Sequence, residues 1–145
     1  MTEETKKKYP VGTCFHEAGH AVVAAALGLA VGTLHINADD ESGGAEVGLP
    51  DVSFIDQAAL CFASLEAQSI WRCRSEHRAG GDDHRRFFKL VSGLSDDCRE
   101  ALRQAGCERA RDLLQANKHV VKEIAQHLIE RGRMTAAEFK QFRGD

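Results

Sequence analysis

Residues 13–27 read TCFHEAGHAVVAAAL. Three polar residues in this apolar stretch, His16, Glu17 and His20, spell the H-E-x-x-H signature. On an α-helix, side chains at positions i and i+4 lie one above the other, so both imidazoles can reach one metal ion while Glu17 flanks it. The stretch therefore predicts a metal-binding helix that ends at Gly28.

The spacing of these residues suits a hydrolytic zinc site. Catalytic zinc takes three protein ligands and leaves its fourth position to a water, whose pKa falls to about 7. Glu17 follows the first histidine directly, and it can accept the water's proton and later give it to the leaving amine. Because the chain has seven histidines, chance would give the motif in roughly a few per cent of sequences of this composition. The first interpretation is Zn²⁺ with Glu17 as the general base.

The third metal ligand has to come from elsewhere in the chain. No histidine follows at the short spacing of the H-E-x-x-H-x-x-G-x-x-H class, which excludes that class. The candidates are Glu66, His77, Asp82, Asp83 and His84. A glycine-rich loop ending at a helix start could deliver either aspartate, whereas Glu66 is more typical of a helix surface than of a partner of a zinc-bound histidine. The residues alone leave the choice open, and a carboxylate ligand would also suit other divalent ions.

Hydropathy patterns predict a mostly α-helical fold with a small β-hairpin or short sheet. Alternation at 33–37 and 45–49 predicts the strands, with His35 on the solvent face. Thr13 is the expected cap of the first helix. Further helices are predicted at about 52–73, 82–94, 95–114 and 120–131, and at 135–142, where Thr135 and Glu138 form a capping box. The last three helices are expected to form a C-terminal bundle.

Length and composition indicate a single domain over residues 11–145, preceded by a disordered polar segment, 1–10. The net charge of −3, from 22 acidic and 19 basic residues, indicates no class of partner. A basic cluster between Arg72 and Lys89 has acids among it, so a solvated surface is favoured over nucleic-acid binding. The longest apolar run, 21–31, is far shorter than the roughly 20 residues that a membrane span needs.

The five cysteines form no C-x-x-C pair and are odd in number, so no disulfide framework is indicated. A reducing cytoplasm is the expected location. Cys14 lies two residues before the first histidine, and we expect it to be a small buried side chain rather than a metal ligand.

Residues 16–22, HEAGHAV, resemble the metal-binding helix of the FtsH family of ATP-dependent zinc metalloproteases. Residues 33–50 are similar to the strand, glycine-rich turn and strand ending in Leu-Pro that follow in that family, and residues 98–139 resemble its C-terminal helices. The resemblance covers nearly the whole chain from about Val11 and concerns the peptidase domain alone. It implies a zincin-like helical peptidase domain.

The resemblance also implies a ligand set. In the family, the third zinc ligand is an Asp in a Gly-Ala-x-Asn-Asp motif that opens a helix. Residues 79–83, AGGDD, align with this motif, so Asp83 is the implied ligand and Asp82 occupies the place of the family's Asn. The extra carboxylate keeps Asp82 as an alternative. The implied site is thus His16, His20 and Asp83 around Zn²⁺, with Glu17 as the catalytic residue.

The chain departs from the family in three ways. It contains no G-x-x-x-x-G-K-[ST] motif and neither an AAA+ ATPase nor transmembrane segments. The segment between Asp83 and Asp96 is short, and residues 67–69, AQS, replace the family's Ala-Glu-Glu. The expected function is therefore an ATP-independent zinc metalloendopeptidase that cleaves short or unfolded polypeptides, with a separate ATPase or adaptor as a conceivable partner. The alternative is an inactive peptidase-like zinc-binding module that acts as an adaptor or regulator, and the oligomeric state stays open, a homo-oligomer included.

Overall fold

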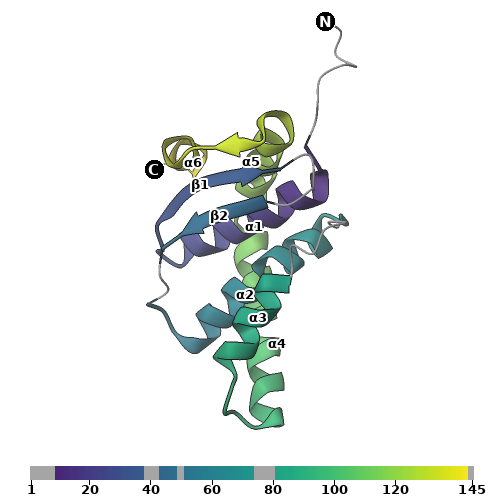
Figure 1. Cartoon of the computed structure of the whole chain (residues 1–145), viewed down its shortest axis with the longest axis vertical. Helices are drawn as coiled ribbons and strands as arrows, with labels where there is room; N and C mark the ends of the chain where they lie inside the picture. Colours follow the sequence, from purple (N-terminus) through teal and green to yellow (C-terminus); the bar gives the residue numbers. More distant parts are fainter. Residues whose placement is uncertain (1–8, 38–42, 49–50, 74–80, 144–145) are drawn as a thin grey trace, which may run out of the picture.

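A computed structural model describes residues 9–37, 43–48, 51–73 and 81–143, and only the backbone at Gly81 and Asp82. The elements are α1 (Val11–Ala26), β1 (Val31–Ile36), β2 (Gly43–Val47), α2 (Phe54–Ile70), α3 (Gly81–Leu90), α4 (Asp96–Ala116), α5 (Lys118–Arg131), β3 (Arg133–Met134) and α6 (Ala136–Arg143). Figure 1 shows β1 and β2 running alongside α1, with α5 and α6 at one end of the molecule and α2, α3 and α4 at the other. The predicted mostly α-helical fold with a small sheet is confirmed.

Helix α1 lies at the centre of the molecule. Its residues from Gly12 to Ala25 are buried except for the half-buried Phe15, so neighbours cover almost every face of the helix. The predicted cap is wrong: the helix begins after Pro10 without a side-chain cap, and Thr13 is a fully buried residue inside its first turn. Gly28 follows the helix with a φ of +85°, a left-handed conformation that favours glycine.

The sheet has three antiparallel strands in the order β2, β1, β3. Leu34 of β1 pairs with Ala45 of β2 on one side and with Met134 of β3 on the other, and its side chain is fully buried. The predicted pair of strands is confirmed, as is the exposure of His35. Strand β3 was not predicted, because two residues are too few to show an alternating pattern.

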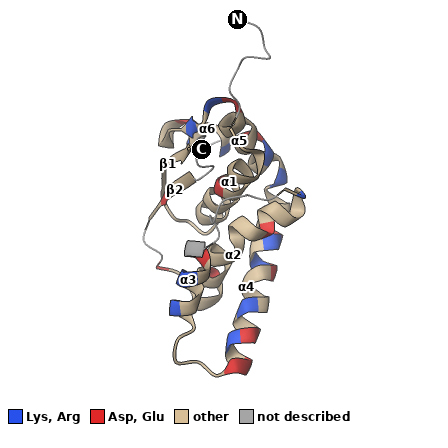
Figure 2. Cartoon of the chain, turned by 45° about the vertical axis from the view of Figure 1, so that its right-hand side comes forward, with Lys and Arg blue, Asp and Glu red and all other residues tan. Residues whose placement is uncertain are grey.

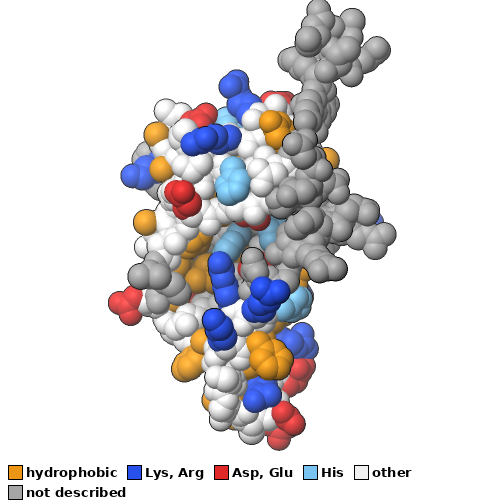
Figure 3. Space-filling view, in the orientation of Figure 1, with side chains coloured by type: hydrophobic (Ala, Val, Ile, Leu, Met, Phe, Trp, Pro, Cys, Tyr) orange, Lys and Arg blue, Asp and Glu red, His pale blue; other side chains and the backbone are white. Residues whose placement is uncertain are grey.

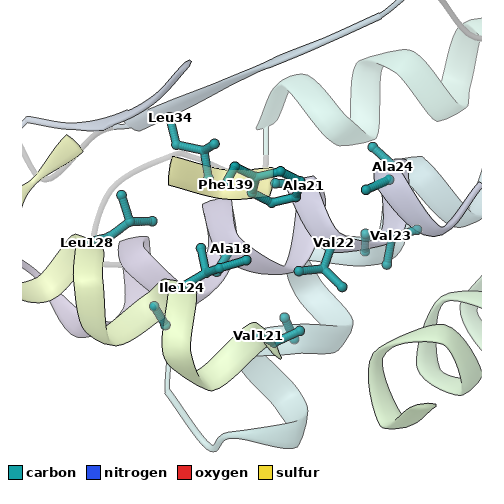
Figure 4. Packing of buried hydrophobic residues seen from close by; sticks show 14 of the residues in the cluster. Ala18, Ala21, Val22, Val23, Ala24, Leu34, Val121, Ile124, Leu128 and Phe139 are labelled. Carbon is teal, nitrogen blue, oxygen red and sulfur yellow. The ribbon is translucent and has the colours of Figure 1, made fainter. Parts of the chain in front are cut away.

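The core forms where α1 meets α5 and the sheet. Figure 4 shows Ala18, Ala21 and Val22 of α1 among apolar side chains from the sheet, α5 and α6, and they include Leu34, Val121, Ile124, Leu128 and Phe139. Each large aliphatic side chain buried in this way contributes about 1.5–3 kcal/mol to the free energy of unfolding. The packing therefore holds the motif helix rigidly from this side.

Helix α2 packs against another side of α1, and α4 packs against α2. Two glycines permit these close approaches: a Cβ on Gly19 of α1 would collide with Cβ of Ala67, and a Cβ on Gly106 of α4 would lie 2.6 Å from Cβ of Ala58. Acidic and basic residues occur close together along α4 (Figure 2). The C-terminal helices α4 and α5 thus pack mainly on α2 and α1, respectively.

Local signals in the sequence place several helix ends. The hydroxyl of Ser95 accepts a hydrogen bond from the Cys98 amide and caps α4, which begins where the helix 95–114 was predicted to start. The capping box is confirmed by reciprocal hydrogen bonds between Thr135 and Glu138, of 2.9 and 3.2 Å. Ser53 caps α2, which is shorter at both ends than the predicted 52–73, and α3 ends at Leu90 rather than 94.

The predicted disordered segment lies outside the described residues except for Tyr9 and Pro10. The amide of Tyr9 donates a hydrogen bond to the Ile129 carbonyl oxygen at 3.0 Å, which ties this point of the chain to α5. Among the described helices, none combines the length and the apolar character needed to cross a membrane.

Candidate metal centre

Helix α1 presents the motif residues inside the protein. His16, Glu17 and His20 expose only 3%, 4% and 8% of their surface. Polar side chains this deeply buried usually have a functional or a pairing role, because leaving them without compensating partners costs free energy. The motif is therefore buried in the centre of the fold and not on a solvated helix face.

Helix α3 brings a carboxylate to this centre. Oδ2 of Asp83 lies 3.5 Å from Nε2 of His16, and Oε1 of Glu17 lies 3.7 Å from the same nitrogen. Asp83 is itself 5% exposed. The ring of Phe87, one turn further along α3, packs on Phe62 of α2 with centroids 4.8 Å apart, and this contact fixes α3 against the site. The structure thus brings together two of the three predicted ligands and the predicted base.

Burial sets the protonation of the two histidines. It lowers the pKa of both His16 and His20 to about 4, so both imidazoles are neutral near pH 7. The side chain of Gln68 opposes this shift at His16, and the positive charge of Arg86 adds to it at His20. A neutral imidazole has the free electron pair that a metal ligand needs.

Glu17 is shifted in the opposite direction. Burial first and then the nearby Asp83 carboxylate raise its pKa to about 8, against the opposing effect of Arg86. Two buried acids and two neutral histidines form a donor set that favours a divalent cation, since a cation would offset the repulsion between the carboxylates.

The separation of His16 and Asp83 can be compared with zinc geometry. Two ligands bound tetrahedrally at about 2.0–2.1 Å from zinc lie about 3.3 Å from each other, close to the 3.5 Å observed. His20 is a suitable third zinc ligand by its chemistry. It forms no ion pair with a carboxylate among the described side chains. Within the described residues, no three His, Cys, Asp or Glu side chains are gathered closely enough to hold a metal ion together. The residues fit zinc by donor type, and the full three-ligand site is a proposal.

The other sequence candidates lie away from the site or outside the described residues. Glu66 forms an ion pair of 3.2 Å with Arg111 of α4, which agrees with the favoured surface interpretation. His84 is exposed. His77 and the side chain of Asp82 lie outside the described residues. Cys14 is fully buried as predicted, and burial raises the pKa of its thiol to about 12.

The structure places two further residues next to the motif: Gln68, which the sequence marked only as a departure from the family, and Gly43. Gln68 of α2 is buried, and its amide nitrogen donates to the carbonyl oxygen of Gly12 at 3.0 Å. Gly43 is the first residue of β2. A Cβ on it would lie 3.1 Å from Cγ of Glu17, so the start of β2 lies close to the motif. A polar residue inside the apolar stretch of α2 was the available signal for Gln68, and nothing local marked Gly43.

A pocket of about 340 Å³ opens beside the site. Its lining comes from α1, the end of β2, α2 and α3, and consists of His20, Val47, Gly48, Gln57, Leu60, Cys61, Arg86 and Leu90. Strand β2 pairs with β1 on one edge, and its other edge has no strand partner among the described residues. The buried acids, the pocket and a strand edge therefore occur at one place.

Comparison with known proteins adds no relative: no family model matches the chain, and no curated protein matches it.

Proposed function

We propose that the chain is a zinc-dependent endopeptidase that resembles the peptidase domain of the FtsH family and cleaves short or unfolded polypeptides without ATP. The observation that carries the proposal is the approach of Asp83 to His16 within 3.5 Å, with Glu17 beside the same imidazole nitrogen. His16, His20 and Asp83 would hold the zinc. When bound, zinc would activate a water and polarise the substrate carbonyl.

Glu17 moves the protons in this mechanism. Its carboxylate accepts a proton from the attacking water and then donates it to the amine of the departing peptide. A pKa raised to about 8 in the metal-free site favours the protonated form that the second transfer needs, and zinc would lower it by stabilising the carboxylate. The deep burial of Glu17 also keeps bulk water from replacing the substrate as its partner.

Strand β2 supports the binding of an extended substrate. A peptide can add to a free strand edge through main-chain hydrogen bonds, and its side chains then alternate between the two faces of the sheet. Gly43 at the start of β2 contacts Glu17, and Val47 and Gly48 at its end line the pocket. A peptide on this edge would therefore run past the proposed base and place one side chain at the pocket. We further propose that the enzyme works in the reducing cytoplasm, with a separate ATPase or adaptor supplying folded substrates.

The test compares wild-type protein with Glu17→Gln. Both proteins should bind one zinc per chain in elemental analysis, because Glu17 is not a ligand. Cleavage of unstructured peptides should fall by about 10²–10⁴-fold in the variant. A zinc-loaded wild type that cleaves nothing in a broad peptide library would contradict the proposal.

Two observations favour a second candidate, an inactive zinc-binding module that regulates a partner. The described residues do not gather three metal ligands, and Gln68 stands where the resembling family has a carboxylate. A module of this kind would bind zinc with equal affinity in wild type and Glu17→Gln but would show no turnover in either. The same pair of proteins therefore separates the two functions.

A further inference from the structure

The pocket beside His20 has apolar walls and one permanent charge. Val47, Leu60 and Leu90 supply aliphatic surface. Cys61 adds to that surface, because burial raises the pKa of its thiol to about 11 and keeps it neutral. Among the described residues of the lining, Arg86 is the one with a permanent charge.

Arg86 belongs to the face of α3 that points at the site. Asp83, Arg86, Phe87 and Leu90 follow one another at positions i, i+3, i+4 and i+7, which share one face of a helix. Asp83 reaches His16, Phe87 packs on Phe62, and Leu90 lines the pocket. Arg86 therefore lies on the same helix face at the pocket wall, where its side chain is also exposed to solvent.

The charge of Arg86 is available to a ligand. The guanidinium forms no ion pair with a carboxylate within the described part of the chain. It affects the site over a longer range, since it lowers the pKa of Glu17, His20 and Cys61. Arg85 and Lys89 on the same helix are exposed, and Figure 3 shows Lys and Arg side chains gathered over α3 below the sheet. The local charge is thus positive although the net charge of the chain is −3.

We propose that this pocket binds a carboxylate-bearing residue of the substrate next to the scissile bond, with Arg86 as the specificity-determining partner. The inference rests on the proposed peptidase function. A glutamate side chain matches the pocket, because its methylene groups can lie on the aliphatic wall while its carboxylate pairs with the guanidinium. The C-terminal carboxylate of a short peptide has the same chemistry, and the experiment separates the two sources.

The first arm measures kcat/KM of the zinc-loaded enzyme on a set of peptides. The peptides differ only at one residue beside the cleaved bond, and this residue is Glu, Gln, Leu or Lys. We expect Glu to be favoured over Gln by about 10-fold or more, the usual effect of a hydrogen bond to a charged group. Arg86→Ala should abolish this preference, and Arg86→Glu should shift it toward Lys. Lys89→Ala, a charge loss on the same helix outside the pocket, should leave the preference unchanged. Peptides with amidated C-termini that keep the preference assign it to the side chain, and loss on amidation assigns it to the chain terminus.

The second arm measures binding without turnover. Zinc-loaded Glu17→Gln protein should bind the Glu peptide about 10-fold more tightly than the Gln peptide, and adding Arg86→Ala should remove the difference. Efficient cleavage with equal kcat/KM for Glu and Gln overturns the specificity proposal and leaves the peptidase function intact. If no peptide is cleaved at all, the peptidase function fails, and the binding arm still decides the pocket: equal Kd values for the two peptides overturn its selectivity.

Discussion

Oδ2 of Asp83 lies 3.5 Å from Nε2 of His16, so these two side chains join the start of α3 to the motif helix α1. Most of the proposed metal centre depends on this pairing. If it marks a shared zinc, removing the carboxylate must weaken metal binding, and the neighbouring aspartate offers a matched control.

Asp83→Asn should weaken zinc binding by more than 100-fold, since loss of a direct ligand exceeds the 10–100-fold effect of losing an outer-shell partner. Isothermal titration with zinc, or competition with a chromophoric chelator, measures the affinity. Asp82→Asn removes the same charge one residue earlier and should change the affinity far less. The opposite order of the two variants would assign the ligand to Asp82.

Gln68→Ala should weaken zinc binding by about 10–100-fold and leave the fold intact. The Gln68 amide nitrogen donates to the Gly12 carbonyl oxygen, and the Gln68 side chain raises the pKa of the neighbouring His16, so we expect the free Gln68 oxygen to help orient that imidazole toward a metal. Gln68→Glu, which keeps an acceptor at this place, should retain more affinity than Gln68→Ala. Ser69→Ala on the exposed side of α2 is the control. Equal affinities in all four proteins would exclude a role for Gln68 in positioning His16.

Gly19→Ala should lower the free energy of unfolding by about 1–3 kcal/mol, because the new methyl group would collide with Ala67 and lie 3.3 Å from the Ala63 carbonyl oxygen. Urea unfolding measures the loss. Adding Ala67→Gly should restore part of it, since that change reopens the contact between α1 and α2. Gly48→Ala, whose methyl group would meet no atom closer than 3.5 Å, should cost less than about 0.5 kcal/mol.

The stability of the metal-free protein should depend on pH through the buried site. Burial holds the pKa of Glu17 at about 8, above its usual 4.5, so its contribution is full below pH 4.5 and is lost as pH rises through 8. His16 and His20 are shifted down from 6.5 to about 4, so their contribution is full above pH 6.5 and is lost as pH falls through 4.

Thermal unfolding of wild type and Glu17→Gln in chelator tests this dependence. The Tm of the variant relative to wild type should rise between pH 4.5 and 8 and then level off, because Gln cannot ionise. Both proteins should lose stability below about pH 6. A constant difference in Tm across this range would show that Glu17 titrates at its ordinary pKa.

Local chemistry made much of this structure predictable. Ser95 caps α4, and Thr135 with Glu138 caps α6, because side-chain oxygens reach the free amides of a helix start whatever surrounds it. The same reasoning failed at Thr13, where tertiary packing buries a residue with good capping chemistry inside the first turn of α1. Sequence alone predicted the motif helix because its periodicity and its metal chemistry agree.

The site itself was less predictable, because it joins segments that are distant in the chain. The motif named His16, Glu17 and His20, but only the family resemblance favoured Asp83 over Asp82, since neighbouring carboxylates are equivalent in a pattern. Gln68 and Arg86 gain their importance from the packing of α2 and α3 around α1. Arg86 is exposed, as expected for a solvated basic cluster, but sequence does not show which residue of such a cluster also lines a pocket.

The outer edge of β2 has a further consequence, for self-association. A strand edge that is open to an extended peptide is also open to the same strand of another copy, and such pairing is a common start of aggregation. Strand β2 has only five residues, begins with Gly43 and Gly44, and carries the exposed Glu46. Its short length, its weak β-propensity and its charge disfavour a lasting pairing between two copies. The residues that would let a substrate chain pair transiently, as proposed, therefore also help to keep the protein from polymerising through this edge.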